Sequence, residues 1–144
     1  MAQTDLNKEL TKLIQLDIDA VHAYGQAIEE IEDPAIRERI TAFQSDHKEH
    51  IETLGKEVRA LGDTPPEYSP DFKGYLIEGF TALRSKTGTK GALKAMKSNE
   101  ELTNKKYDKA RSMDLTPSVR TVIEKNFNDE RRHLEYIESQ LAVL

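Results

Sequence analysis

Two stretches of this chain, residues 10–58 and 93–141, match each other when the sequence is shifted by 83 positions. Apolar and polar positions both recur, and the match runs through the central turn without a gap. The matched pairs include Leu10 and Leu93, Asp17 and Glu100, Tyr24 and Tyr107, Ile40 and Ile123, His47 and Glu130, His50 and His133, and Leu54 and Ile137. A unit that occurs twice in one chain predicts two copies of one supersecondary structure that pack together.

Within each copy, apolar residues recur at spacings of three and four, which predicts amphipathic helices rather than strands. We expect four long helices: one over about residues 4–32, one from 34 to about 61, one over about 90–113, and one from 117 whose apolar stripe extends to Leu144. Asp33-Pro34 and Thr116-Pro117 each place a capping side chain before a proline, a pattern typical of helix starts. Gly62 predicts the end of the second helix.

The segment between the second and third helices has a different composition. Residues 63–74 are rich in proline and turn formers and predict a loop, residues 72–85 predict a short helix, and the TGTKG stretch at 87–91 predicts a second break. This connection of about 28 residues is long enough to cross the length of a helical bundle. The second and third helices would then run parallel to each other, whereas each repeated hairpin is antiparallel.

The composition limits the possible classes of protein. The 144 residues suit a single domain, 1–144, and a third of them are charged, with a net charge of −5. We therefore expect no nucleic-acid partner, which would need a basic face, and no membrane span, which would need an apolar run of about 20 residues. The chain has no cysteine, which excludes disulfides, thiolate zinc sites and cysteine nucleophiles. Because the first residues lack the apolar core of a signal peptide, we expect a cytoplasmic location.

Six ionisable residues lie on the predicted apolar stripes, where the core should be. They are Asp17, His47, His50, Glu100, Glu130 and His133. Burying such groups without partners costs several kcal/mol each, and a pair of divalent metal ions would remove most of that cost. Carboxylate and imidazole ligands without sulfur suit iron, manganese or zinc. The spacing of three between Glu130 and His133 places both side chains on one helical face, so that both can reach one metal.

Each of these residues has an ordinary interpretation when taken alone. Asp17 could be a buried carboxylate bonded to a neighbour, and His47 could be a core histidine with its hydrogen bonds satisfied. Their matched depth on four helices favours a metal site. Tyr24 and Tyr107 lie two turns from the carboxylates. They serve either in core packing or in a role at the metal site, where they would contact the metal ligands or take part in redox chemistry. The flanking acids are expected to face solvent, with Asp46 or Glu101 as the alternatives to a proposed ligand; these acids are Asp19, Asp46, Glu49, Glu101 and Asp129.

These residues resemble those of the ferritin-like di-iron carboxylate superfamily, which includes rubrerythrin and bacterioferritin, over nearly the whole chain. The family places a glutamate on the first and third helices and Glu-x-x-His on the second and fourth. Glu100, Glu130 and His133 match this pattern, and His50 matches the histidine of the second helix. The Asp17 to Tyr24 spacing is similar to that in rubrerythrins, although the cysteine site of a full rubrerythrin is missing. The DHxxH string at 46–50 looks like that of small uncharacterised bacterial ferritin-like four-helix-bundle proteins.

The resemblance implies an all-α, ferritin-like four-helix bundle made of two repeated hairpins, with a long crossover that contains a short helix. Two departures from the family pattern bear on its metal site. Asp17 is one carbon shorter than the expected glutamate, and His47 stands where a bridging glutamate is expected. Since a neutral imidazole gives one lone pair to one metal, the analogy leaves Glu130 as the only bridge. Asp17, His47 and His50 would then serve one metal, and Glu100 and His133 the other, which should bind less tightly. The analogy therefore leaves open an unequal site or one that holds a single metal.

The resemblance also implies a function. The expected cofactor is two iron ions, with manganese or zinc as alternatives, and the expected activity is that of an oxidoreductase such as a ferroxidase or peroxidase. Its partners would be metal ions and O₂ or peroxide, and a homodimer is possible. The alternatives are a non-catalytic metal-binding, storage or stress protein and a metal-free helical interaction module.

Overall fold

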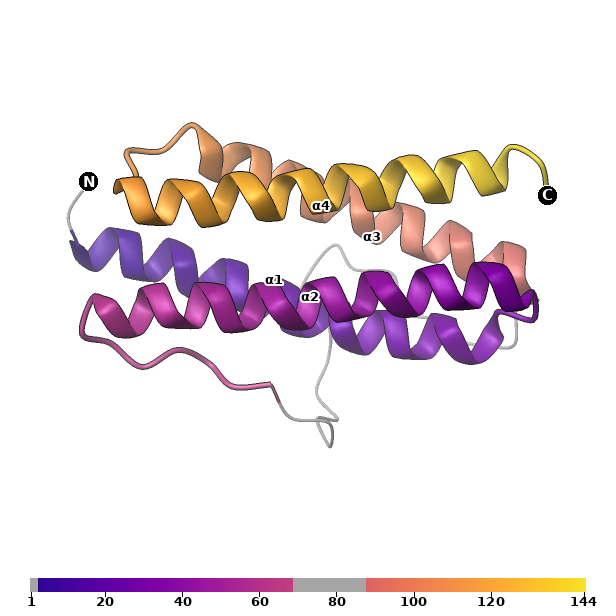
Figure 1. The fold of residues 1–144 in the computed structure, drawn as a ribbon, viewed down its shortest axis with the longest axis horizontal. Helices are drawn as coiled ribbons and strands as arrows, with labels where there is room; N and C mark the ends of the chain where they lie inside the picture. Colours follow the sequence, from indigo (N-terminus) through magenta and orange to yellow (C-terminus); the bar gives the residue numbers. More distant parts are fainter. Residues whose placement is uncertain (1–2, 69–87) are drawn as a thin grey trace.

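Four long helices lie side by side in the computed structural model, which describes residues 3–68 and 88–144 (Figure 1). They are α1 (Gln3–Glu30), α2 (Pro34–Ala60), α3 (Gly88–Arg111) and α4 (Pro117–Leu141). No strand occurs in these two ranges, so the prediction of an all-α four-helix bundle is confirmed. The short helix predicted over 72–85 lies outside the described residues.

The helices form two antiparallel hairpins that pack against each other. Short turns join α1 to α2 and α3 to α4; α1 also packs against α3, and α2 against α4. In Figure 1, α1 and α4 run in one direction and α2 and α3 in the other. The predicted parallel arrangement of the second and third helices is therefore confirmed. α2 ends at one end of the bundle, and α3 begins at the other.

The helix ends follow the predicted capping signals, with one correction. Asp33 Oδ1 accepts hydrogen bonds from the backbone N–H groups of the first turn of α2, and Thr116 caps α4 in the same way. Gly62 has a φ of +84° just beyond α2. The predicted break at 87–91 is too long: α3 begins at Gly88, where a φ of +70° lets one residue redirect the chain. Thr89 is already helical, and its hydroxyl accepts a hydrogen bond from Glu32 N at 2.9 Å.

The core consists of two apolar clusters, one towards each end of the bundle. The first contains Leu10, Ile14, Leu54, Val58 and Ile123, and the second contains Ile31, Ile36, Phe43, Met96 and Ile137, each with further neighbours. On α2, α3 and α4, the polar stripe residues lie between the residues of these two clusters, and on α1 Asp17 lies beside Leu16 and Ile18 of the first cluster. The predicted inner stripe is wrong at its end: Leu144 is 50% exposed because α4 stops at Leu141.

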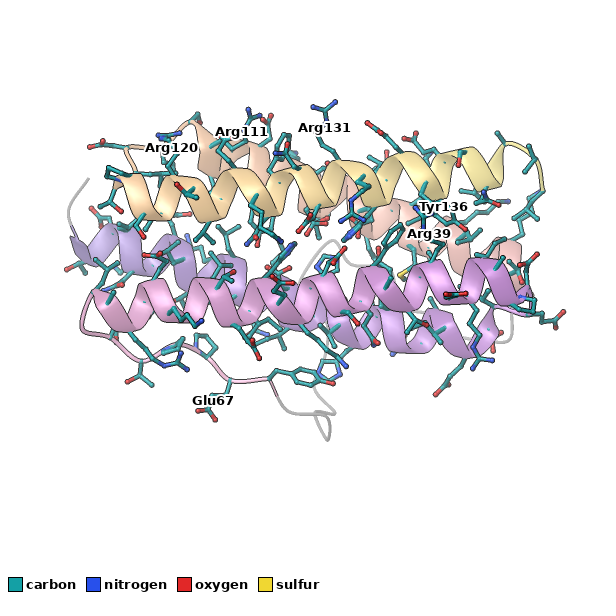
Figure 2. All side chains as sticks on the ribbon, in the orientation of Figure 1. Arg39, Glu67, Arg111, Arg120, Arg131 and Tyr136 are labelled. Carbon is teal, nitrogen blue, oxygen red and sulfur yellow. The ribbon has the colours of Figure 1, made fainter. Side chains whose placement is uncertain are left out.

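Charged side chains occupy the outside of the bundle. Figure 2 shows Arg120 and Arg131 pointing away from the α1–α2 hairpin, and Arg39 beside Tyr136 between α2 and α4. The Arg39 guanidinium lies 4.5 Å from the centroid of the Tyr136 ring, a cation–π contact. Within the described ranges, every helix is too polar to cross a bilayer.

Candidate metal centre

The structure brings together all six polar residues that the sequence places on the inner stripes. Asp17 comes from α1, His47 and His50 from α2, Glu100 from α3, and Glu130 and His133 from α4. Each is buried, with at most 1% of its surface exposed. The shared depth arises because the 83-residue offset places equivalent helical positions at the same level in both hairpins. These buried carboxylates and imidazoles form two groups that could hold a metal ion.

The first group consists of Asp17, His47, His50 and Glu130. Asp17 Oδ1 lies 2.7 Å from His47 Nδ1 and 3.1 Å from His50 Nδ1. Glu130 Oε1 completes the group at 3.4 Å from His47 Nδ1 and 3.5 Å from His50 Nδ1. Four donor atoms from three helices therefore converge on one small volume.

The second group consists of His47, Glu100, Glu130 and His133. Glu100 Oε1 lies 3.1 Å from His47 Nε2 and 3.2 Å from His133 Nδ1. Glu130 Oε2 lies 3.5 Å from His133 Nδ1. Two residues, His47 and Glu130, thus belong to both groups and present a different atom to each. This differs from the sequence-based assignment, in which His47 serves one metal only.

Two carboxylates outside this cluster hold the outer nitrogens of two histidines. Asp129 Oδ2 lies 2.9 Å from His50 Nε2, and Asp46 Oδ2 lies 2.8 Å from His133 Nε2. The expectation that both acids face solvent is wrong, since their side chains are only 14% and 25% exposed. The offset of 83 relates Asp46 to Asp129, and this match was the signal that could have identified them.

Two tyrosines donate hydrogen bonds to carboxylates of the opposite hairpin. The Tyr24 hydroxyl donates to Glu100 Oε1, and the Tyr107 hydroxyl donates to Asp17 Oδ2 at 2.5 Å. Both rings are fully buried, so each tyrosine packs in the core and also contacts the polar cluster. The Thr103 hydroxyl lies 3.0 Å from both Glu100 Oε2 and Glu130 Oε2, a link between these two carboxylates that the sequence reasoning did not include.

The remaining flanking acids separate into two kinds. Glu49 and Glu101 are exposed, as expected, which removes Glu101 as an alternative ligand. Asp19 is fully buried, contrary to expectation, and accepts a hydrogen bond from Gln15 Nε2 at 3.1 Å. It is absent from both groups of converging atoms. Its burial shows that α1 is covered on a second face as well as on its core stripe.

The electrostatics of the cluster keep the histidines charged in the metal-free protein. Burial alone would lower the pKa of His47, but Glu130, Asp17 and Glu100 outweigh it and raise the pKa to about 9. Burial likewise opposes the charge of His133, whose pKa is raised to about 11 chiefly by Glu100 and Asp46. The pKa of Glu130 is raised above its ordinary value by burial and by the charge of Glu100.

The two acids with most histidine contacts behave in the opposite way. Burial would raise the pKa of Glu100, but His133 and His47 hold it well below its ordinary value. Burial also opposes the charge of Asp17, whose pKa is lowered by His50 and His47. Without metal, the cluster is therefore a set of buried ion pairs.

A family model described as a domain of unknown function, DUF2383, matches residues 5–112. This match spans three quarters of the 144 residues. It includes α1 except for its first two residues and all of α2 and α3, and it ends just past Arg111. The chain belongs to the DUF2383 family. A search of curated proteins finds no significant match. In this DUF2383 chain, Glu130 and His133 lie beyond the matched region, so the family match covers four of the six cluster residues.

The geometry of the DUF2383 chain fits a metal ion in each group. Two donors bound to one ion at about 2.1 Å lie roughly 3.0–3.4 Å apart for octahedral to tetrahedral angles. The separations of 2.7–3.5 Å in the two groups lie close to this range. In addition, Glu130 Oε1 is buried and has no hydrogen-bond partner among the described residues. A metal ion would satisfy this oxygen, which otherwise carries a desolvation cost.

Proposed function

We propose that this chain is a ferritin-like metal protein that holds two non-haem iron ions and uses them in redox chemistry with peroxide or O₂. The observation that carries the proposal is the convergence of two sets of four buried donor atoms, which share His47 and Glu130. This arrangement agrees with the carboxylate and histidine sites built between the helices of ferritin-like bundles.

The donor set supports iron as the metal. The cluster offers three carboxylates and three imidazoles and no sulfur, which suits iron and, as alternatives, manganese or zinc. Asp129 and Asp46 hold the outer nitrogens of His50 and His133, so the Nδ1 atoms are aimed inwards. Histidines that bind metals are commonly held by a carboxylate in this way. These outer contacts distinguish the cluster from a chance gathering of acids.

When bound, two ferrous ions would supply the two electrons that convert one hydrogen peroxide molecule and two protons into two water molecules. The residues of the chain would orient the ligand carboxylates and keep water away from the site. Tyr24 and Tyr107 each keep a hydroxyl proton directed at a ligand carboxylate. The apolar clusters above and below exclude bulk water from the site.

Metal content and peroxide consumption test the proposal together. The protein would be produced with iron, manganese and zinc all available, purified mildly and analysed for metals, and ferrous-loaded protein would then be mixed with peroxide. We expect about two iron ions per chain and peroxide consumption that depends on them. Glu100→Gln alters only the second group, so this variant should bind about one iron ion and lose peroxide consumption. The control is Glu101→Gln, at an exposed position, which should keep both the metal content and the peroxide consumption of the wild type. Metal binding without any peroxide or O₂ consumption would leave a storage or buffering protein instead.

A metal-free structural role is the second candidate, and one observation favours it. In each of the three buried histidines, each ring nitrogen lies within 3.2 Å of a carboxylate oxygen, and the two nitrogens contact different carboxylates. The cluster can therefore stand as a set of ion pairs without any metal. Protein that contains no metal after mild purification, and that takes up no ferrous ion in an anaerobic titration, would support this role and contradict the first.

A further inference from the structure

We propose that His47 bridges the two metal ions as an imidazolate, with Nδ1 bound to one ion and Nε2 bound to the other. This inference rests on the proposed two-metal site and assigns a role that a neutral imidazole, with one lone pair, does not have. The evidence comes from the direction of its two nitrogens, from the contrast with the other two histidines, and from the charge of the ligand set.

The two ring nitrogens of His47 face different carboxylates. Nδ1 lies 2.7 Å from Asp17 Oδ1, in the first group, and Nε2 lies 3.1 Å from Glu100 Oε1, in the second. The ring is fully buried and packed against the Tyr24 and His133 rings, each with its centroid 5.2 Å away. This packing holds the ring between the two groups.

The other two buried histidines are oriented differently. His50 and His133 each direct Nδ1 into the cluster and use Nε2 to contact an outer carboxylate, Asp129 or Asp46. His47 alone among the three has no outer carboxylate and both nitrogens inside the cluster. The structure therefore builds two histidines as terminal ligands and one as a link between two sites.

An imidazolate is also compatible with the charge of the ligand set. Two divalent ions carry four positive charges, and Asp17, Glu100 and Glu130 supply three negative ones, all in a fully buried site. A net charge left in such a site is costly. An imidazolate at His47 would supply a fourth negative charge within the ligand set. The bond changes balance: the ring gives up both N–H protons to solvent and forms two metal–nitrogen bonds in their place.

Glu130 occupies the equivalent position in the other hairpin and complements His47. It presents Oε1 to the first group and Oε2 to the second, at 3.5 Å from His50 Nδ1 and His133 Nδ1 respectively. The two repeat-related residues thus form a mixed pair of bridges, one imidazolate and one carboxylate. This pair replaces the two carboxylate bridges that a symmetric repeat would give.

The distance between the metals tests the bridge without any measurement of activity. Metal-free protein would be crystallised, soaked anaerobically with ferrous ions, and analysed by anomalous diffraction at the iron edge. Metal–nitrogen bonds of about 2.1 Å on opposite sides of the ring place the two ions about 6 Å apart. Two ions at roughly 3.5–4 Å, the spacing usual for two-metal sites, with His47 bound through one nitrogen, would overturn the bridge but leave the two-iron proposal intact. A single ion would also overturn the bridge, and no ion at all would contradict the proposed function itself.

Two substitutions at position 47 provide an independent test in solution. The variant His47→Glu carries a negative charge at position 47 without the loss of ring protons. Two ferrous ions should still bind, now at the spacing of roughly 3.5–4 Å usual for two-metal sites. Gln in His47→Gln supplies no charge, so affinity for the second ion should fall by more than about tenfold, the lower bound for loss of an outer-shell contact. Glu49→Gln, an exposed position on the same helix, is the control and should leave both affinities unchanged. Equal affinity for the second ion in the wild type and in His47→Gln would overturn the bridge.

Discussion

His133 Nε2 lies 2.8 Å from Asp46 Oδ2, and this contact joins the last helix of the second hairpin to the second helix of the first. Asp129 makes the reciprocal contact with His50 at 2.9 Å. Both aspartates also bond the guanidinium of Arg132, whose nitrogen lies 2.9 Å from Asp46 and 3.1 Å from Asp129. The outer acids are therefore held at the surface end by one arginine while they orient two histidines within.

The first prediction concerns these outer acids. Asp46→Asn and Asp129→Asn keep the size of the side chain but remove the charge that orients His133 and His50. We expect ferrous affinity to fall about 10- to 100-fold in each variant, as is typical for outer-shell changes. Anaerobic calorimetric titration measures this, with Glu49→Gln as the exposed control. Wild-type affinity in both aspartate variants would show that the histidines hold their orientation without them.

The second prediction concerns the buried tyrosines. Tyr24→Phe and Tyr107→Phe each remove a hydroxyl that donates to an ionised carboxylate, Glu100 or Asp17. We expect each to destabilise the metal-free protein by about 1.5–3 kcal/mol, the usual value for a hydrogen bond to a charged group. Urea denaturation measures the loss, and Tyr136→Phe, at a partly exposed position, should change stability little. A loss in the Tyr136 variant as large as in the other two would show that the cluster contacts are not its cause.

The third prediction is the pH dependence of the metal-free protein. The folded pKa of His47 is about 9 and that of His133 about 11, both above the ordinary 6.5. The protonated histidines therefore make their full contribution to the free energy of unfolding below pH 6.5. This contribution is lost as the pH rises through 9 and then 11. Because the folded state binds more protons, stability should fall by up to about 1.4 kcal/mol per pH unit for each proton concerned.

Urea midpoints measured between pH 6.5 and 9 test this dependence. His47→Gln should show a shallower fall over that interval, since one of the titrating groups is gone. A midpoint that stays constant or rises across the interval in the wild type would mean that the buried histidines are neutral in the folded protein.

The fourth prediction concerns metal removal. A ligand that binds only the folded state stabilises it, by about 2.7 kcal/mol when it is present at a hundredfold excess over Kd. Chelation should therefore lower the melting temperature, and Glu130→Ala, which removes a donor from both groups, should melt at a temperature that depends less on ferrous ion. Identical melting curves for loaded and verified metal-free wild type would contradict the prediction.

Much of the fold follows from local signals in the sequence. Asp33-Pro34 and Thr116-Pro117 fix two helix starts because capping acts through neighbouring residues. The cluster residues share one depth because the offset of 83 is constant along both helices of the hairpin. The short helix predicted at 72–85 stays a prediction.

The errors arise where a residue's surroundings come from another helix. Asp46 and Asp129 lie one position before His47 and Glu130, so helical spacing alone placed them away from the core. Their partners, His133 and His50, belong to the opposite hairpin. The direction of the His47 ring could not be read from spacing either, because its two nitrogens contact residues of different helices. Pairing of these residues depends on how the hairpins dock.

The reciprocal contacts between the hairpins have the form of a twofold interface, in which each half offers the other the same surface. In a dimer of two identical single hairpins, any change at the residue nearest the symmetry axis would appear on both sides at once. A histidine at that position would then face another histidine, and a glutamate another glutamate. Joining both hairpins in one chain removes this restriction, so that His47 and Glu130 can differ while the surrounding contacts keep their symmetry. Covalent linkage thus allows two different residues at the centre of the bundle, which a symmetric dimer of identical hairpins could not have.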